Sequence, residues 1–150
     1  MNNTLHLLLV DDNSNDRELV RHELCQEFPD MQIEQAADPD SLAQALEQPG
    51  YEIVIVDYKL VWTDGLAVLK AAKTRWPDCA VIMFTGSGNE EVAVEALKAG
   101  VDDYLTKSPH HLGHLATMVR SNLEQIRQRR SLKETQTGYL KLFNTVPVGL

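Results

Sequence analysis

The sequence predicts a single α/β domain built on a parallel sheet, because three observations agree. Five apolar segments of strand length alternate with five segments of helical periodicity. The connections between them are short, and Gly, Pro, Asn and Asp stand at the junctions. Such alternation places helices on both faces of a sheet whose strands all run in one direction. Because crossovers are right-handed, few topologies remain, and the doubly wound, flavodoxin-like order 2-1-3-4-5 is the expected one.

The first unit begins with the apolar run Leu5–Val10, which fits a central strand buried on both faces. Residues 13–15 are Asn, Ser and Asn, whose side chains cap helix N-termini, and Pro29 closes the helix that follows. A shorter alternating strand is expected at Met31–Ala36. The apolar positions at helical spacing in the first helix are Leu19, Val20 and Leu24.

The second helix begins at Asp38–Pro39, since proline fits the first turn of a helix, and ends at Pro49–Gly50. The next strand, Tyr51–Val56, is β-branched and uninterrupted, and it is the clearest strand pattern in the chain. A loop leads to Asp64–Gly65, where the third helix begins, and Trp76–Pro77 interrupts that helix. The apolar positions of these two helices are Leu42, Ala45, Leu46, Leu66, Val68, Leu69 and Ala72.

The last two strands are expected at Ala80–Phe84 and within Val101–Thr106. Between them lies a helix that Asn89 can cap and that runs through Lys98. Gly100 follows this helix and is the residue type that most often ends one in a left-handed backbone conformation.

The final helix is expected to begin near His110 and to protrude beyond the domain to about residue 137, where Gly138 breaks it. Its C-terminal half is basic although the chain as a whole is acidic, which is typical of a connector or a dimerising coil; a solvated, frayed helix is the alternative. The expected organisation is a domain at 1–125, a helical linker or coiled coil at 126–138, and the start of another domain at 139–150. The positions at helical spacing along this helix form an apolar stripe that shifts around the helix and is interrupted by polar residues. They are Leu115, Val119, Asn122, Ile126 and Lys133.

The composition fits one globular domain with an appendage, with 43% apolar and 24% charged residues among 150. The formal net charge of −8 argues against direct binding of nucleic acid by the main domain. No apolar run approaches the roughly 20 residues that span a bilayer, and no cationic segment precedes Leu5–Val10, so neither a membrane span nor a signal peptide is expected. Cys25 and Cys79 match no metal motif and are expected to be reduced thiols of a cytoplasmic protein.

Polar side chains stand at or next to the carboxyl ends of the predicted strands, and these ends gather along one rim where ligands bind. Carboxylates packed closely need a cation, and several hard oxygen ligands suit Mg²⁺. Asp57 is the natural nucleophile, because carboxylates form acyl phosphates, while Thr85 and Lys107 could each hold a phosphoryl oxygen. The set therefore indicates a phosphorylatable switch, and it comprises Asp11, Asp12, Asp57, Thr85, Tyr104 and Lys107.

At these residues the chain resembles the receiver domain of two-component response regulators, the CheY-like superfamily, over roughly residues 4–125. Each matching piece alone is weak, but the combination is highly specific. The pieces are Leu-Leu-Leu-Val-Asp11-Asp12, Ile-Val-Ile-Val-Asp57, Asp64-Gly65, Val-Ile-Met-Phe-Thr85-Gly86 and Ala99-Gly100-Val-Asp-Asp-Tyr104-Leu-Thr-Lys107.

The resemblance implies that Asp57 accepts a phosphoryl group from a histidine kinase or a phosphotransfer protein. It implies that Thr85 and Tyr104 then move together and reshape the face made by the fourth helix, the fifth strand and the last helix. That change would regulate a downstream output domain in the same polypeptide, with a histidine kinase and a cyclic-dinucleotide enzyme both open. The only chemistry implied for this chain is Mg²⁺-assisted transfer of the phosphoryl group to its own Asp57 and the later loss of that group. The implied Mg²⁺ ligands are Asp12, Asp57 and the main-chain carbonyl of Lys59, with Asp11 acting through water.

Two positions depart from the family's pattern. Proline usually stands four residues after the phosphoacceptor, where this chain has Val61. Proline in a cis peptide also usually follows the site lysine, whereas here Ser108 follows Lys107 and Pro109 comes one residue later. A cis bond before a residue other than proline costs about 3 kcal/mol, so either the site holds that strain or the loop differs.

A second, weaker resemblance and two alternative functions complete the predictions. Tyr139–Leu150 is similar to the opening of a PAS sensory domain, which suggests that a further domain follows. A receiver fold used only for binding or dimerisation is one alternative, although the complete acid set with Lys107 argues against it. A hydrolase of the haloacid dehalogenase type is another, but its Asp-x-Asp motif is absent, since Tyr58 and Lys59 follow Asp57. A homodimer is a further expectation, formed either through the last helix or through the face made by the fourth helix, the fifth strand and the last helix.

Overall fold

The computed structural model describes residues 5–86 and 89–145, with side chains described as far as residue 132. Five parallel strands form one sheet in the order β2-β1-β3-β4-β5, which confirms the predicted topology. The strands are β1 (His6–Val10), β2 (Gln32–Ala36), β3 (Ile53–Val56), β4 (Ala80–Thr85) and β5 (Asp103–Thr106). The helices are α1 (Ser14–Glu27), α2 (Pro39–Leu46), α3 (Gly65–Arg75), α4 (Glu90–Ala99), the 3₁₀ turn η1 (Pro109–His111) and α5 (Leu112–Thr145).

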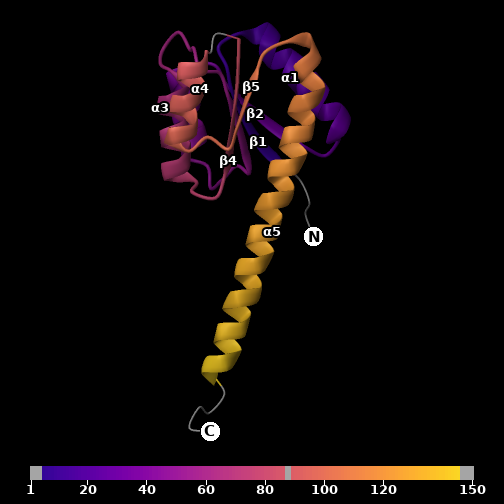
Figure 1. Cartoon of the computed structure of the whole chain (residues 1–150), viewed down its shortest axis with the longest axis vertical. Coiled ribbons are helices and arrows are strands. Elements are labelled where there is room, and N and C mark those ends of the chain that lie inside the picture. The colour runs from indigo at the N-terminus through magenta and orange to yellow at the C-terminus, as the bar shows by residue number, and fades with distance from the viewer. Residues whose placement is uncertain (1–4, 87–88, 146–150) are drawn as a thin grey trace.

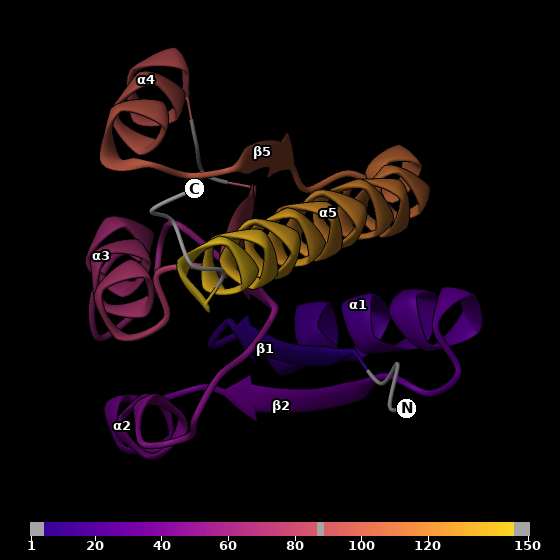
Figure 2. The ribbon, with the colours of Figure 1, turned by 90° about the horizontal axis from the view of Figure 1, so that it is seen from below.

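Helices cover both faces of the sheet, and each face has its own apolar core. Figure 2 shows α2, α3 and α4 on one side of the strands and α1 and α5 on the other. Successive side chains of a strand point to opposite faces, so Val54 and Val56 pack under α3 while Ile53 and Ile55 face the other layer. The central strands β1, β3 and β4 are almost entirely buried, as uninterrupted apolar runs require in a parallel sheet.

Side-chain caps begin four of the helices at the places that the sequence predicts. Asn13, Asp38, Asp64 and Asn89 each accept a hydrogen bond from a main-chain N–H in the first turn of the helix that follows. Gly100 ends α4 with a φ of 102°, a left-handed conformation that an L side chain rarely adopts. The four N-caps therefore set where each loop from a strand to the next helix ends.

Two details of the helices differ from the sequence-based expectation. Leu19 was expected among the apolar positions of α1, but its side chain is 55% exposed, because Val20 and Leu24 form the stripe that meets the sheet. The expected break of the last helix at Gly138 is wrong, since α5 continues to Thr145. One internal glycine costs only about 1 kcal/mol relative to alanine, which does not by itself end a helix whose flanking residues keep their hydrogen bonds.

The first half of α5 packs on the domain and the second half leaves it. Leu115, Val119 and Ile126 are buried against the sheet, whereas beyond them the helix extends away from the domain as a single rod (Figure 1). No helix in the described part of the chain combines the length and apolarity needed to span a bilayer. The PAS-like segment expected at Tyr139–Leu150 begins within this helix, and its residues 146–150 lie outside the described part.

Candidate functional site

The carboxyl ends of four strands bring the predicted residues to one rim of the sheet. The parallel register aligns Val10 with Val56, so Asp11 and Asp57 follow side by side, and the Asp57 N–H donates to the Val10 carbonyl at 3.1 Å. The next strands place Lys107 beyond Thr85, where the Lys107 N–H donates to the Thr85 carbonyl at 2.9 Å. Backbone pairing therefore assembles the site before any side-chain contact is considered.

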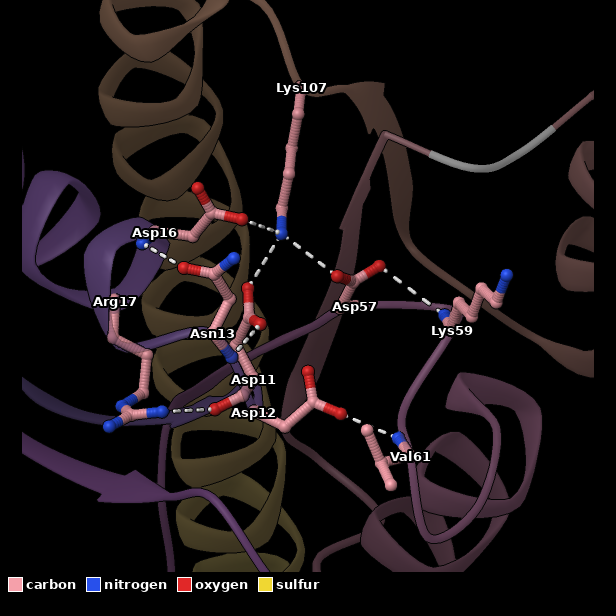
Figure 3. A network of polar contacts seen from close by, with 9 residues as sticks. All are labelled: Asp11, Asp12, Asn13, Asp16, Arg17, Asp57, Lys59, Val61 and Lys107. Atoms are coloured by element: carbon pink, nitrogen blue, oxygen red, sulfur yellow. Dashed lines mark hydrogen bonds and ion pairs between the residues drawn. The ribbon is translucent and has the colours of Figure 1, made fainter.

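Lys107 lies at the centre of the site (Figure 3). Its ammonium Nζ lies 2.7 Å from Oδ2 of Asp11, 2.7 Å from Oδ2 of Asp16 and 2.8 Å from Oδ2 of Asp57. Asp11 and Asp57 follow strands, whereas Asp16 comes from the first turn of α1. One cation thus holds together three carboxylates that would otherwise repel one another.

The ion pairs of Lys107 are largely buried, so water and salt screen them less than pairs on the surface. The side chains of Asp11, Asp57 and Lys107 are only 5%, 11% and 16% exposed. Burial lowers the pKa of Lys107, but its hydrogen bonds to the carboxylates outweigh burial, and the net effect is a raised pKa. Burial also raises the pKa of Asp11, and the hydrogen bond from Lys107 opposes this only in part. The lysine is therefore firmly protonated at neutral pH, whereas Asp11 holds its negative charge at a cost.

Asp12 and Lys59 lie at the edge of the cluster and do not contact Lys107. Oδ2 of Asp12 accepts a hydrogen bond from the main-chain N–H of Val61 at 2.5 Å, and the Lys59 N–H approaches Oδ1 of Asp57 at 3.3 Å. The Lys59 side chain points away from the carboxylates (Figure 3). The loop after β3 thus closes against both aspartates through its backbone.

The start of α3 holds the loop that carries Asp57. The Gly65 N–H donates to the Tyr58 carbonyl at 2.6 Å, and the backbones of Lys59 and Asp64 form an isolated antiparallel bridge. A Cβ added at Gly65 would lie 2.7 Å from the carbonyl oxygen of Asp57 and 2.9 Å from Cα of Tyr58. Close approach of two backbones is the physical reason for glycine in the Asp64-Gly65 pair.

Thr85 and Tyr104, the two expected switch residues, lie on adjacent strands. Thr85 is fully buried at the end of β4, and Tyr104 pairs in register with Met83, two residues before Thr85. The Tyr104 hydroxyl is buried and has no hydrogen-bond partner among the described residues. Burial, and then the charge of Asp57, raises the pKa of Tyr104. A buried hydroxyl without a partner is energetically costly, which favours a side chain that can change its position.

The donor set fits a hard divalent cation in chemistry, although it is not arranged around one. Oxygens of Asp11 and Asp57 both lie within 2.8 Å of one positively charged atom, the Nζ of Lys107, and carboxylates suit Mg²⁺. No cluster of three His, Cys, Asp or Glu residues in the described segments is poised to hold a metal ion. Oδ2 of Asp12 already accepts the N–H of Val61, so a cation bound there would share this oxygen with the N–H or bind Oδ1.

The structure brings together most of the predicted set and adds two residues. Asp16 and Arg17 were not among the predicted site residues, yet Asp16 binds Lys107, and Arg17 donates to the main-chain carbonyl of Asp11 at 2.7 Å. The available signal was spacing, since Asp16 lies one helical turn after Asp12 at the start of a predicted helix. The Lys107–Ser108 peptide, which the sequence left open, is trans.

Comparison with known proteins identifies relatives of this chain. A family model for the response regulator receiver domain matches residues 7–120. The phosphate regulon transcriptional regulatory protein PhoB of Klebsiella pneumoniae is 37% identical over 112 residues, which cover 71% of this chain and 47% of PhoB. This chain therefore spans about half the length of that relative.

Two solved structures have the same fold. A CheY-like response regulator receiver domain protein from Methanospirillum hungatei JF-1 superposes with a TM-score of 0.75 at 26% identity, covering 84% of this chain and 98% of that one. The BeF3-activated DrrB receiver domain superposes with a TM-score of 0.71 at 25% identity, covering 81% of this chain and 98% of that one.

Proposed function

The chain belongs to the response regulator receiver domain family, and on that basis we propose that it is a phosphoacceptor switch modified on Asp57. The phosphodonor would be a histidine kinase or a phosphotransfer protein of a two-component phosphorelay. The observation that carries the proposal is the Lys107 ammonium 2.8 Å from the Asp57 carboxylate, at a rim reached by three further carboxylates. The DrrB receiver domain, which was studied as a BeF3-activated form, is a relative that supports it.

In the proposed reaction, a carboxylate oxygen of Asp57 attacks the phosphorus of a phosphohistidine. The new O–P bond forms as the P–N bond breaks, and the electron pair of that bond returns to the donor imidazole. Lys107 pairs with a phosphoryl oxygen as a point charge, and the Thr85 hydroxyl donates to another. Bound Mg²⁺, held by Asp12, Asp57 and the Lys59 carbonyl with Asp11 through water, would neutralise charge on the carboxylate and the phosphoryl group.

The proposed response lies on the face formed by α4, β5 and α5. Thr85 would move toward the phosphoryl group, and Tyr104, whose hydroxyl has no described hydrogen-bond partner, would follow it. On α4, Val94 and Leu97 are 48% and 61% exposed, so this helix offers apolar surface to a partner or a second copy of the domain. The long α5 would carry the change toward an output domain.

We further propose the larger organisation implied by the sequence. Residues 1–125 form the receiver domain, 126–138 the helical linker and 139–150 the start of a PAS-like domain. PhoB is named a transcriptional regulator, but the net charge of −8 favours a role for this chain without direct contact to nucleic acid. We place the protein in the cytoplasm with no membrane contact, and we propose no enzymatic activity for this chain beyond turnover of its own phosphoryl group.

Intact-mass measurement tests the phosphoacceptor function directly. The protein is incubated with acetyl phosphate, with and without Mg²⁺, beside the Asp57→Asn variant. A Mg²⁺-dependent gain of one phosphoryl group that the variant lacks is the expected result. No gain in the wild-type protein, with Mg²⁺ binding confirmed by calorimetry, would overturn the proposal.

The second candidate function is a receiver fold that binds or dimerises without phosphorylation. The observation that favours it is that the carboxylates of Asp57 and Asp12 have protein partners, the Lys107 ammonium and the Val61 N–H. In that case Asp57→Asn would leave dimerisation and partner binding unchanged, as measured by sedimentation with and without acetyl phosphate.

A further inference from the structure

Asp16 is the one carboxylate on Lys107 that no strand end supplies. The distance from Oδ2 of Asp16 to Nζ of Lys107 is 2.7 Å, the same as for Asp11 and slightly shorter than the 2.8 Å for Asp57. The backbone of Asp16 is held in the first turn of α1, where its N–H donates to Oδ1 of Asn13 at 3.0 Å. The contact is therefore built by the helix cap and does not depend on a free loop (Figure 3).

The three carboxylates use the full donor capacity of Lys107. A lysine ammonium has three N–H donors, and here three acceptors surround it. A phosphoryl group on Asp57 would add about −1.5 to −2 charge and new acceptor oxygens. Lys107 can donate to one of these oxygens only if it releases a carboxylate that it now holds.

Asp16 is the carboxylate that Lys107 can release most easily. Its side chain is 33% exposed, compared with 5% for Asp11 and 11% for Asp57, so water can replace the ammonium at Asp16. Asp11 is also held by its other oxygen, Oδ1, which accepts the N–H of Asn13 at 2.9 Å. The Asp16 contact is thus the weakest of the three in free energy.

There is space for Asp16 to move. Asp16 and Lys107 both line an open cavity of about 480 Å³ between α1 and the start of α5, beside Leu19, Phe84 and Leu112. The cavity is open to solvent and the Asp16 side chain is 33% exposed, so a carboxylate that leaves Lys107 can turn toward water at the edge of the cavity. The exchange of partners needs no repacking of the core.

We propose that Asp16 is a positioning residue that competes with the phosphoryl group for Lys107 and so slows phosphorylation of Asp57. The inference rests on the phosphoacceptor function proposed above. Because Lys107 is shared with Asp16, it is less available to stabilise the transferring phosphoryl group. A neutral residue of the same size at this position should release Lys107 toward Asp57 and raise the rate.

The test compares three variants in the rate of phosphoryl gain from acetyl phosphate at saturating Mg²⁺, followed by intact mass. Asp16→Asn removes the charge, Asp16→Glu restores a carboxylate, and Glu18→Gln is the matched control. Glu18 lies on the same helix and pairs with Arg21, away from Lys107. Asp16→Asn is expected to react about fivefold faster, the upper range for losing one partly exposed charge pair. Asp16→Glu and Glu18→Gln are expected to react at close to the wild-type rate.

Each outcome decides a different question. Equal rates for Asp16→Asn and the wild-type protein would overturn the role of Asp16 and leave the phosphoacceptor function standing. An equal increase in Glu18→Gln would also overturn it, because the cause would then be the general charge of the protein. No phosphoryl gain in the wild-type protein would overturn the phosphoacceptor function and this inference together. The melting temperatures of all variants show whether a change in rate comes from unfolding. If Asp16→Asn is unstable, Asp16→Ser takes its place.

Discussion

The carboxylate of Asp12 accepts the main-chain N–H of Val61 at 2.5 Å, which ties the end of β1 to the loop after β3 across 49 positions of sequence. Val61 contributes only its backbone to this contact, since its side chain is 93% exposed. Receiver domains usually have proline at this position, and proline has no N–H to donate. The departure therefore adds a hydrogen bond to a carboxylate that we propose as a Mg²⁺ ligand.

Replacing Val61 by proline is expected to increase the affinity for Mg²⁺. Without the N–H, Oδ2 of Asp12 no longer shares its negative charge with a loop donor and can bind the cation more strongly, and a hydrogen bond to a charged group corresponds to about a tenfold change in affinity. Calorimetric titration with Mg²⁺ measures the change. Val61→Ala keeps the N–H and should bind as the wild-type protein does, so the same gain in Val61→Ala would refute the explanation.

The two thiols are expected to differ in reactivity. Burial raises the pKa of Cys79 to about 11, whereas Cys25 is partly exposed. At pH 8 a thiol reagent should therefore label one site in the native protein and two in urea, and Cys25→Ser should leave none in the native protein. Rapid labelling of native Cys79 would contradict its burial.

The raised pKa of Cys79 also makes the stability of the protein depend on pH. Its folded pKa lies above the ordinary thiol value of 9.0, so the unfolded chain loses the proton first as the pH rises. The contribution of Cys79 to the free energy of unfolding should be complete below pH 9 and decrease between pH 9 and about 11. Cys79→Ala should show a smaller decrease over this window in urea unfolding.

Lys107→Met is expected to destabilise the protein by about 3 kcal/mol at neutral pH, because it leaves neighbouring buried carboxylates without a cation. The second variant, Lys107→Met with Asp57→Asn, should recover part of that loss, because it removes one of the opposing charges. Added Mg²⁺ should also stabilise Lys107→Met. Urea unfolding measures the free energy of unfolding of Lys107→Met, of the double variant, and of Lys107→Met with Mg²⁺. Equal losses of stability in the single and double variants would contradict an origin in charge.

The sign of the pH effect at Lys107 follows from its raised pKa. The stabilising ion pairs are complete below the ordinary lysine pKa of 10.5 and are lost as the pH rises through the higher folded value. The wild-type protein should therefore lose stability in strong alkali to a greater extent than Lys107→Met does. This comparison uses the same urea experiments at several pH values.

The fold and the strand-end residues could be predicted because both follow from periodicity. Uninterrupted β-branched runs such as Ile53–Val56 identify buried parallel strands, and a parallel register then places Asp57 beside Asp11. The contacts of Asp16 and Asp12 could not be predicted in this way. The spacing of Asp16 one helical turn after Asp12 places it near the rim, but both contacts themselves depend on side-chain rotamers and on one loop backbone, which the spacing does not determine. The extension of α5 through Gly138 was missed because a single glycine is a weak signal.

Gly65→Ala is expected to damage both stability and phosphoryl acceptance, because the added Cβ would lie 2.7 Å from the Asp57 carbonyl oxygen, a backbone atom that cannot turn aside. The loop after β3 would have to shift by several tenths of an ångström, at a cost of about 1 to 3 kcal/mol typical of overpacking. Gly113→Ala in α5 is the matched control, since nothing lies within 4 Å of its added Cβ, and alanine there should stabilise the helix by about 0.5 to 1 kcal/mol. Urea unfolding and acetyl phosphate labelling of both variants make the comparison. A normal labelling rate in a destabilised Gly65→Ala would mean that the loop can move without displacing Asp57, and that Gly65 serves stability alone.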